Sequence, residues 1–302
     1  MKMEMEYHNQ VLLKETVDGL NIKPDGIYVD VTFGGGGHSR EIMSRLGENG
    51  KLFAFDQDLD ALKNAIDDER FTLINENFRF IKRFLRFHGI KQVDGILADL
   101  GVSSHQFDVA ERGFSTRFDA ELDMRMNQKG DISAYHVVNE YDEQEISRVL
   151  FNYGELKNAR AMANVIVTAR KDKEIKNSEQ LKQVLAKFLP GHKSNKILAQ
   201  IYQAIRIEVN QEMEVLKEFL EQSLEILKPG GRLSVISYHS LEDRLVKRFV
   251  KNGMFEGEPE RDFFGNFEVP FNTIEKLIVP SEEEIAINNR ARSAKLRVSE
   301  KI

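Results

Sequence analysis

Residues 30–39 read DVTFGGGGHS, and the place of this stretch between a predicted strand and a predicted helix decides the fold. The apolar run from Ile27 to Val31 predicts a short buried strand, and residues 39–46 predict the helix that follows the glycines. Glycines permit positive φ and let a ligand approach the backbone, while a helix N-terminus presents unpaired N–H groups. A strand, a glycine loop and a helix in this order predict a site for a nucleotide-like cofactor.

The residues alone leave three interpretations of this glycine loop. A nicotinamide dinucleotide site needs a G-x-G-x-x-G spacing, but its third glycine would stand at Ser39 or Arg40. A tight strand-to-helix turn without a ligand is the second interpretation. The third is the loop of a Rossmann-like methyltransferase, in which an acid at the end of the first strand precedes the glycines, and Asp30 occupies that position. Four consecutive glycines favour a ligand site over a bare turn.

The composition predicts a soluble globular protein. The chain has 302 residues, of which 41% are hydrophobic, so it can bury a sizeable core. No apolar run approaches the length of a membrane span and residues 1–6 lack an apolar core, so we expect a cytoplasmic protein with no membrane segment. Cysteine is absent, which excludes disulfides, thiolate metal sites, iron–sulfur clusters and a cysteine nucleophile.

Positive charge is concentrated in one part of an acidic chain. The net charge is −6, yet residues 155–200 contain ten lysines and arginines against four acids, a local charge of +6. Such a block is either a solvated helical surface or a nucleic-acid contact. Its basic residues are Lys157, Arg160, Arg170, Lys171, Lys173, Lys176, Lys182, Lys187, Lys193 and Lys196.

Polar residues follow the next predicted strands at their carboxyl ends. A second strand, residues 51–55, ends at Asp56, where a carboxylate can accept hydrogen bonds from both hydroxyls of a ribose. Asp58 is expected to cap the helix that follows, residues 59–66. A third strand, residues 71–75, precedes Phe78, which is either a core aromatic or a platform for a cofactor base.

The fourth predicted strand, residues 93–98, leads into a second polar loop. Asp99, Ser103 and Gln106 lie in or beside this loop. Ligands of doubly wound sheets bind beyond the carboxyl ends of the strands, so these side chains should line the cleft beside the glycine loop.

The strand–helix alternation stops after this loop and resumes later. Residues 109–210 show no convincing strand, so we expect an all-helical insertion between two halves of an α/β domain, residues 1–108 and 211–302. A fifth strand, entered through a turn at residues 228–231, brings His239 to its carboxyl end, and residues 275–279 and 294–298 should form a terminal hairpin. Helices are expected near 142–152, 155–171, 178–188 and 196–226, the first with a capping box of Asp142 and Glu145, and another from a box-like run beginning at Ser240.

A set of motifs in fixed order resembles the bacterial small-subunit ribosomal RNA methyltransferase H family, also called MraW. Ala120-Glu121 and Asn289 depart from the family pattern, both in expected loops. The motifs are the acid and glycine loop of residues 30–39, DLGVSSHQ at 99–106, RGFS at 112–115, LDMRM at 122–126, RIEVNQE at 206–212, SYHSLEDR at 237–244 and RARSAKLR at 290–297.

The resemblance implies a Rossmann-like class I fold and methyl transfer from S-adenosylmethionine to the N4 amine of a cytidine in the decoding region of 16S rRNA. The partner would be this rRNA or the small ribosomal subunit, and the oligomeric state stays open, with a homodimer as one alternative. The implied cofactor-binding residues are Gly36, Gly37, His38, Asp56, Phe78, Asp99 and Gln106.

The chemistry of methyl transfer suggests candidates for catalysis and requires no metal. An exocyclic amine becomes nucleophilic as it pyramidalises, and acceptors aimed at its N–H groups favour that change. The lack of cysteine argues against methylation at carbon five of a pyrimidine, which uses a thiolate. A methyltransferase acting on a protein or small molecule, or a non-catalytic RNA-binding assembly factor, are the alternatives. The catalytic candidates are Asp99, Ser103, Asn210 and His239.

Overall fold

The computed structural model describes residues 10–264 and 267–302, and the chain divides into two compact units. One unit, here called the sheet unit, comprises the chain up to Gly101 and from Met213 onward. The other, the helical unit, comprises Val102–Glu212. Its boundaries lie at 101/102 and 212/213, whereas the sequence placed them at 108/109 and 210/211.

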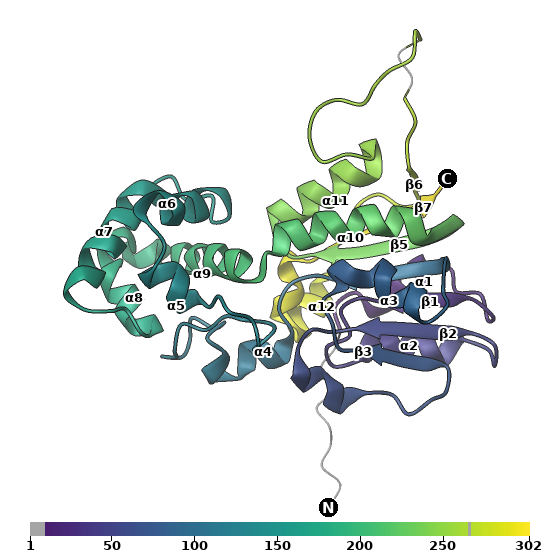
Figure 1. Cartoon of the computed structure of the whole chain (residues 1–302), viewed down its shortest axis with the longest axis horizontal. Helices are drawn as coiled ribbons and strands as arrows, with labels where there is room; N and C mark the ends of the chain where they lie inside the picture. Colours follow the sequence, from purple (N-terminus) through teal and green to yellow (C-terminus); the bar gives the residue numbers. More distant parts are fainter. Residues whose placement is uncertain (1–9, 265–266) are drawn as a thin grey trace, which may run out of the picture. The chain divides into compact units, whose positions relative to one another are not determined.

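The described part of the sheet unit contains a seven-stranded sheet in the order β3-β2-β1-β4-β5-β7-β6 (Figure 1). The pairs among β1 to β5 are parallel, and β7 is antiparallel to both of its neighbours. This is the Rossmann-like α/β architecture that the sequence predicted. The strands are β1 (Ile27–Asp30), β2 (Lys51–Phe55), β3 (Phe71–Ile74), β4 (Val93–Asp99), β5 (Leu227–Ser237), β6 (Phe271–Thr273) and β7 (Lys295–Lys301).

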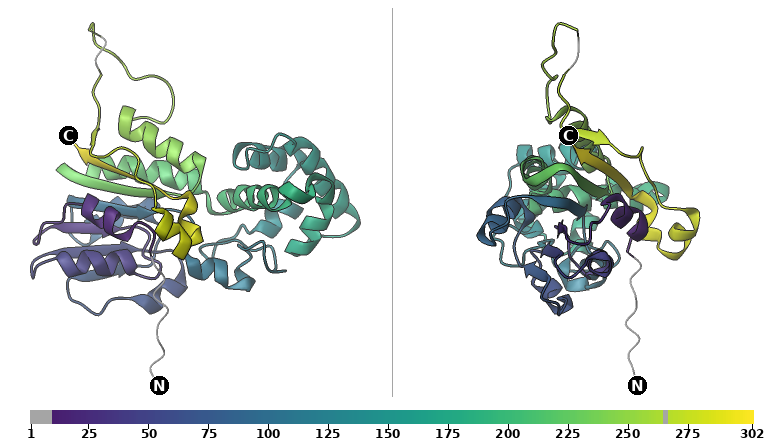
Figure 2. Two further views of the ribbon diagram at one scale, coloured as in Figure 1. Left: turned by 180° about the vertical axis from the view of Figure 1, so that it is seen from behind. Right: turned by 90° about the vertical axis from the view of Figure 1, so that its right-hand side faces the viewer.

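The central strands are buried on both faces, which explains their nearly continuous apolar sequences. Tyr28 and Val29 point to opposite faces of β1, and both are fully buried. Leu52 and Phe53 show the same on β2. Helices therefore have to cover both sides of the sheet, as Figure 2 shows from two directions.

One expected helix of the sheet unit differs in type from the prediction. The expected helix at residues 59–66 is a 3₁₀ helix, η1 (Leu59–Asn64), and Asp58 caps it as predicted by accepting from Asp60 N–H. The other helices are α1 (Leu13–Gly19), α2 (Gly37–Arg45), η2 (Phe78–Phe80), α3 (Ile81–Phe87), α10 (Glu212–Ile226), α11 (Ser240–Asn252), α12 (Glu282–Ile287) and η6 (Asn289–Ser293).

The predicted terminal hairpin was wrong in its first strand. Residues 271–273, rather than 275–279, form β6 and pair with β7, and Ile278 makes only an isolated bridge to Leu296. On its other side, β7 pairs with β5. Residues 228–231, expected as a turn before the fifth strand, form an irregular start of β5 in which Gly230 has φ of +74°.

The helical unit has a hydrophobic core of its own and no β-ladder within Val102–Glu212, all of which is described. Its core side chains come from most of its helices, with Val149, Ala163 and Ile201 fully buried at the centre. The elements are α4 (Ser104–Asp108), η3 (Ala110–Arg112), α5 (Ala134–Asn139), α6 (Glu143–Asn152), α7 (Ala159–Asp172), α8 (Ser178–Val184), η4 (Ala186–Phe188), η5 (Gly191–Lys193) and α9 (Ser194–Asn210).

Two helices of this region are shorter than the sequence predicted. The single helix expected at 196–226 is interrupted at Gln211, whose φ of 51° ends α9 before α10 begins. The helix expected from residue 155 begins at Ala159, and Glu155 itself has a left-handed φ of 52°. The capping box of Asp142 and Glu145 at the start of α6 is confirmed.

No helix of the described residues combines the length and apolar character needed to cross a membrane.

Candidate active site

The glycine loop between β1 and α2 uses its glycines for backbone conformation and for close approach. Gly34 and Gly36 have φ of 50° and 77°, a region that favours glycine. A Cβ on Gly37 would lie 1.9 Å from the side chain of Gln10, whereas one on Gly35 would meet nothing within 4 Å. Gly36 is the N-cap residue of α2 and supplies no side-chain cap, so the loop places backbone that is open at Gly35 next to the N-terminus of a helix.

The carboxylate of Asp30 ties this loop to the first turn of α2. Asp30 is fully buried at the end of β1, and its Oδ2 accepts from Ser39 Oγ at 2.7 Å. Its Oδ1 accepts from the backbone N–H of Thr32 at 3.1 Å. Burial raises the pKa of Asp30, while the nearby His38 and the hydrogen bonds oppose that rise.

The carboxylate of Asp56 ties the tip of β2 to the same loop. Its Oδ2 accepts from Gly34 N–H at 2.7 Å and its Oδ1 from Asp58 N–H at 2.8 Å. Burial raises the pKa of Asp56 to about 6, and the two backbone hydrogen bonds only partly offset this. A carboxylate offers about four lone-pair positions, so these two bonds leave capacity for hydroxyl donors.

Asp99, the last residue of β4, lies between the glycine loop and the end of β5. Its backbone N–H donates to Thr32 Oγ1 at 2.6 Å, and its Oδ1 accepts from the Tyr238 hydroxyl at 2.8 Å. Its Oδ2 lies 3.8 Å from Nδ1 of His38, a buried residue whose Nε2 lies 3.2 Å from the Val11 carbonyl oxygen. Burial raises the pKa of Asp99 to about 6, although His38 and the Tyr238 hydrogen bond act in the opposite direction.

Phe78 begins η2, just beyond β3. Its ring is half-buried and meets the fully buried Phe219 edge to face, with centroids 5.3 Å apart. The ring is therefore held by the core on one side, and its exposed part is available for stacking.

His239 occupies the N-cap position of α11. Its Nδ1 accepts from Glu242 N–H at 3.4 Å, and its backbone N–H donates to Glu242 Oε2 at 3.3 Å. The sequence suggested a cap at Ser240, so the box starts one residue earlier than expected. These contacts give the imidazole a structural task.

In the helical unit, Ser103 and Gln106 form the capping box of α4. Ser103 Oγ accepts from Gln106 N–H at 3.2 Å, and Gln106 Oε1 accepts from Ser103 N–H at 3.1 Å. Gln106 is buried. Both side chains thus fix the path of the chain just after the Asp99 loop.

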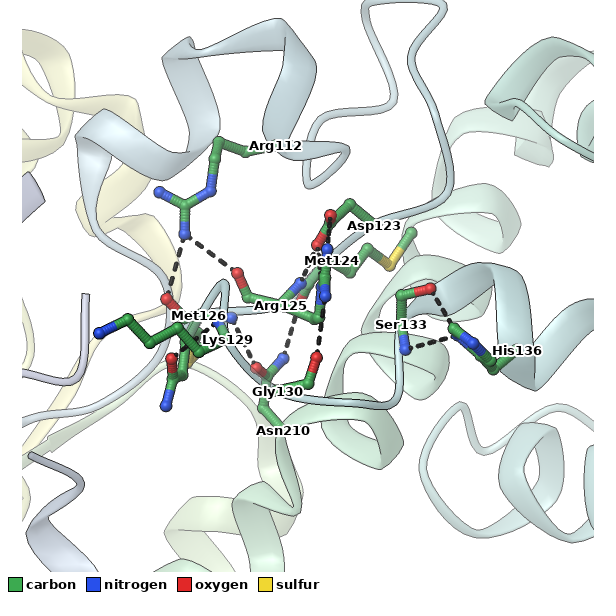
Figure 3. A network of polar contacts seen from close by, with 11 residues as sticks. Arg112, Asp123, Met124, Arg125, Met126, Lys129, Gly130, Ser133, His136 and Asn210 are labelled. Carbon is green, nitrogen blue, oxygen red and sulfur yellow. Dashed lines mark hydrogen bonds and ion pairs between the residues drawn. The ribbon is translucent and has the colours of Figure 1, made fainter. Parts of the chain in front are cut away.

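Asn210, at the end of α9, holds the loop of residues 122–126 (Figure 3). Its Oδ1 accepts from Met126 N–H at 2.7 Å, and its Nδ2 donates to the Met124 carbonyl at 2.8 Å. The buried Arg112 donates to the carbonyls of Arg125 and Met126 at 3.0 and 3.1 Å. Both ends of the Asn210 amide are therefore used to support a loop in which Met124 has φ of 59°.

The structure groups the expected site residues by unit. Gly36, Gly37, His38, Asp56, Phe78, Asp99 and His239 belong to the sheet unit, whereas Ser103, Gln106 and Asn210 belong to the helical unit. Within the sheet unit, the three acids stand at the carboxyl ends of β1, β2 and β4, which is where a doubly wound sheet binds ligands.

Sequence reasoning missed Tyr238 and Thr32 as parts of this site. Tyr238 follows β5, the neighbour of β4, and Thr32 follows β1 on the other side of β4. Their position just after strand ends was a usable signal, but it does not reveal which side chain meets Asp99.

The three strand-end carboxylates, of which Asp30 is fully buried and Asp56 and Asp99 are partly buried, determine what the site can do electrostatically. Asp30, Asp56 and Asp99 all have raised pKa values, so a cationic ligand beside them would restore the charged forms. Strongly perturbed carboxyls grouped at strand ends are typical of functional sites. The arrangement suits a positively charged cofactor with hydroxyl groups.

Comparisons with known proteins agree with this geometry. The model of the MraW methylase family matches residues 5–302. The ribosomal RNA small subunit methyltransferase H of Flavobacterium johnsoniae is 80% identical over 302 residues, covering 100% of both chains. The enzymes of the same name from Christiangramia forsetii and Bacteroides thetaiotaomicron are 68% and 56% identical, covering 100% and 99% of this chain and 100% and 99% of their own.

Proposed function

Because the chain belongs to the MraW methylase family, we propose that it methylates the exocyclic N4 amine of a cytidine in the decoding region of small-subunit rRNA. It is an S-adenosylmethionine-dependent methyltransferase. The observation that carries the proposal is the connected set of three strand-end carboxylates around an open glycine loop. We place the reaction in the cytoplasm, where ribosomal subunits are assembled.

The sheet unit supplies most of the proposed cofactor site. S-adenosylmethionine carries a positive sulfonium, and buried carboxylates favour it electrostatically. Asp56 would accept from the ribose hydroxyls and Phe78 would stack on the adenine. The backbone at Gly36, Gly37 and His38 would approach the cofactor closely. Asp99 completes the part of the proposed site that lies in the sheet unit.

Methyl transfer is an in-line displacement that depends mainly on positioning. The bond from methyl carbon to sulfur breaks as the bond to the N4 nitrogen forms, sulfur leaves as a neutral thioether, and the methylated nitrogen releases its proton to water. Holding the reacting atoms in line can lower the barrier by roughly 7–11 kcal/mol. The protein therefore has to position the cofactor and the acceptor amine, for which a carboxylate facing both is suited, and it requires no nucleophile of its own.

Asp99 is the best-placed of the four catalytic candidates. Ser103 and His239 are engaged in helix caps and the Asn210 amide in a loop contact, which favours supporting roles for them. The Tyr238 hydroxyl donates to Asp99 Oδ1, so we assign the incoming group to Oδ2, which lies 3.8 Å from His38 Nδ1, beyond hydrogen-bond distance. A carboxylate oxygen there would accept from the amine as it pyramidalises.

The variant Asp99→Asn tests this role with little change in shape. Losing a charged acceptor costs about 1.5–3 kcal/mol, so kcat/KM should fall roughly ten- to a hundredfold. A contact made only with the cofactor would raise the cofactor KM, whereas a contact made in the transition state would lower kcat. We expect both constants to change, and wild-type values in a folded variant would contradict the assignment.

The reaction itself is tested on rRNA. Small subunits from a strain lacking this protein are incubated with the enzyme and labelled S-adenosylmethionine, and the rRNA is digested to nucleosides. We expect N4-methylcytidine at one position in the decoding region. Label on another atom of the base would overturn the reaction, label only on protein would favour a protein methyltransferase, and cofactor binding that is undetectable by calorimetry would favour an assembly factor.

We also propose that the helical unit recognises the RNA. Its segment 155–200 carries a charge of +6 within a chain of net charge −6. Binding of the phosphate backbone depends mainly on such local positive charge. The target base would be unstacked to reach the carboxylates at the ends of the strands.

A further inference from the structure

The helical unit has a hollowed surface beside α6 and α7, which is here called the α6–α7 groove. It consists of two adjoining hollows that share Glu143 and Arg160. Lys157 and Lys187 line one of them. Phe151, on the last turn of α6, lines the other.

Unneutralised positive charge is gathered at this groove. Lys157, Arg160 and Lys187 are exposed and make no ion pair with any described residue. The one acid in the lining, Glu143, accepts a hydrogen bond from Asn164 Nδ2 at 3.1 Å. Lys187 Nζ lies 5.0 Å from the centroid of the Phe188 ring, a contact that does not neutralise its charge. The groove therefore offers an excess of positive charge to a polyanion.

Several other residues of the basic block contact groups within the protein. Arg170 donates to two backbone carbonyls, at 2.7 and 2.5 Å. Lys176 lies 3.4 Å from Glu174, and Lys182 lies 3.5 Å from Glu179. The sequence could not separate these residues from Lys157, Arg160 and Lys187, because the difference is one of contacts.

An exposed aromatic ring shares one hollow of the groove with Arg160, beside the hollow that Lys157 and Lys187 line. Phe151 keeps 61% of its surface exposed, although the core of the unit begins one residue earlier at the buried Leu150. A large apolar ring in a basic hollow suits a ligand that is both anionic and aromatic. Single-stranded nucleic acid has this combination, with bases that stack and phosphates that pair with lysine and arginine, whereas the bases of a duplex are already stacked on one another.

We infer that the α6–α7 groove binds a single-stranded stretch of RNA, with one base stacked on Phe151 and its phosphates on Lys157, Arg160 and Lys187. The choice of RNA rests on the proposed function, whereas the location rests on the groove. The groove thereby distinguishes one end of α7 as the RNA contact from the other end, where Lys171 and Lys173 are also basic and exposed.

The test compares two charge reversals of equal size. The groove variant combines Lys157→Glu, Arg160→Glu and Lys187→Glu, and the control variant combines Lys171→Glu, Lys173→Glu and Lys176→Glu. Residues 160 and 171 are separated by about 16 Å along α7 at 1.5 Å per residue. The control variant therefore changes the net charge by the same amount at a different place on the helical unit.

The probe is a fluorescein-labelled single-stranded RNA of twelve nucleotides, followed by anisotropy at several salt concentrations. We expect the groove variant to bind at least tenfold more weakly and its salt slope to fall by roughly 2, since each lost phosphate contact removes about 0.7. The control variant should change the affinity less than threefold. Equal losses in the two variants would overturn the inference, because diffuse attraction would then explain the binding.

The aromatic contact is tested by a second pair of variants that leave the charge untouched. Phe151→Ala should weaken the RNA roughly 5- to 100-fold, whereas Phe151→Tyr, which keeps a ring, should restore most of the affinity. Wild-type affinity of Phe151→Ala would overturn the stacking contact. Calorimetry with S-adenosylmethionine verifies that each variant retains its cofactor site.

The outcomes separate this inference from the proposed function. If the groove variants methylate small subunits at the wild-type rate and bind RNA normally, the groove is not the contact, and the proposed reaction stands. If the oligonucleotide binds the groove but no methylcytidine forms with the wild-type enzyme, the proposed reaction fails and the groove stands. Weaker binding of subunits with unchanged binding of the oligonucleotide would identify a protein as the occupant and overturn the inference.

Discussion

Replacing Tyr238 with phenylalanine should change the pH at which the cofactor site is active. The Tyr238 hydroxyl donates to Asp99 Oδ1 at 2.8 Å and so stabilises the ionised carboxylate. Burial raises the pKa of Asp99 to about 6 even with this bond in place. A hydrogen bond to a charged group is worth about 1.5–3 kcal/mol, and one pKa unit corresponds to about 1.4 kcal/mol. Tyr238→Phe should therefore raise the pKa of Asp99 by a further one to two units.

The consequence is measurable as the pH dependence of cofactor affinity. The ionised form of Asp99 attracts the cationic cofactor, so affinity of the wild type should fall as the pH drops through about 6. In Tyr238→Phe the fall should begin one to two units higher. At pH 7 the variant should bind about two- to tenfold more weakly, and above about pH 9 the two proteins should converge. Calorimetric titration with S-adenosylmethionine between pH 5.5 and 9 gives both curves.

A second tyrosine in the same sheet provides the control. Tyr28 is fully buried in β1, and its hydroxyl accepts from the Lys23 N–H at 2.7 Å. Tyr28→Phe should lower the free energy of unfolding by about 1 kcal/mol and leave the pH midpoint of cofactor binding in place. A midpoint shared by Tyr238→Phe and the wild type would refute the coupling between Tyr238 and Asp99, as would an equal displacement in both variants.

Three further predictions concern residues with defined contacts. Asp56→Asn should weaken S-adenosylmethionine binding by about 1.5–3 kcal/mol in calorimetry, and unchanged affinity would remove Asp56 from the cofactor site. Folding raises the pKa of Asp56 from 3.8 to about 6. This carboxyl therefore destabilises the cofactor-free protein increasingly as the pH rises between those values. In urea unfolding, Asp56→Asn should gain stability relative to the wild type as the pH rises from 4 to 7. A constant difference across that range would contradict the raised pKa. Asn210→Ala should destabilise the helical unit by about 1–3 kcal/mol, since the N–H of Met126 and the carbonyl of Met124 lose their partner, with cofactor affinity unaffected; a loss of cofactor affinity at full stability would show that Asn210 acts at the site instead.

The parts of the fold that the sequence predicted are those with strong local signals. The strands β1 to β4 are apolar runs that end in acids or polar loops, and their parallel order places those ends at one edge of the sheet. β6 was missed because it has three residues and only Phe271 is buried, so no alternation can be detected. Its partner β7 was predicted because that strand is longer and its apolar residues alternate regularly with polar ones.

The break between α9 and α10 had no local signal. A helix that ends in a left-handed residue usually has glycine or asparagine there, but here Gln211 adopts φ of 51°. Arg206 pairs with Glu212 across this turn at 2.8 Å, which stabilises a conformation that glutamine alone would not favour. His239 is similar, since histidine is not a preferred N-cap and its cap with Glu242 depends on the ring nitrogen.

The candidate site was predictable in its residue types but not in its pairings. Asp99 and Tyr238 are 139 positions apart and meet because β4 and β5 are neighbours, with Asp99 aligned with Ile236. Thr32 reaches Asp99 from β1 on the other side. Asp56 and Asp99 thus accept hydrogen bonds from Gly34 and Tyr238, which lie on other elements, whereas the donors to Asp30 are the nearby Thr32 and Ser39. Burying these carboxylates disfavours their charged forms, and a positive charge beside them favours those forms again. The site should therefore bind a cationic cofactor more tightly than its neutral product.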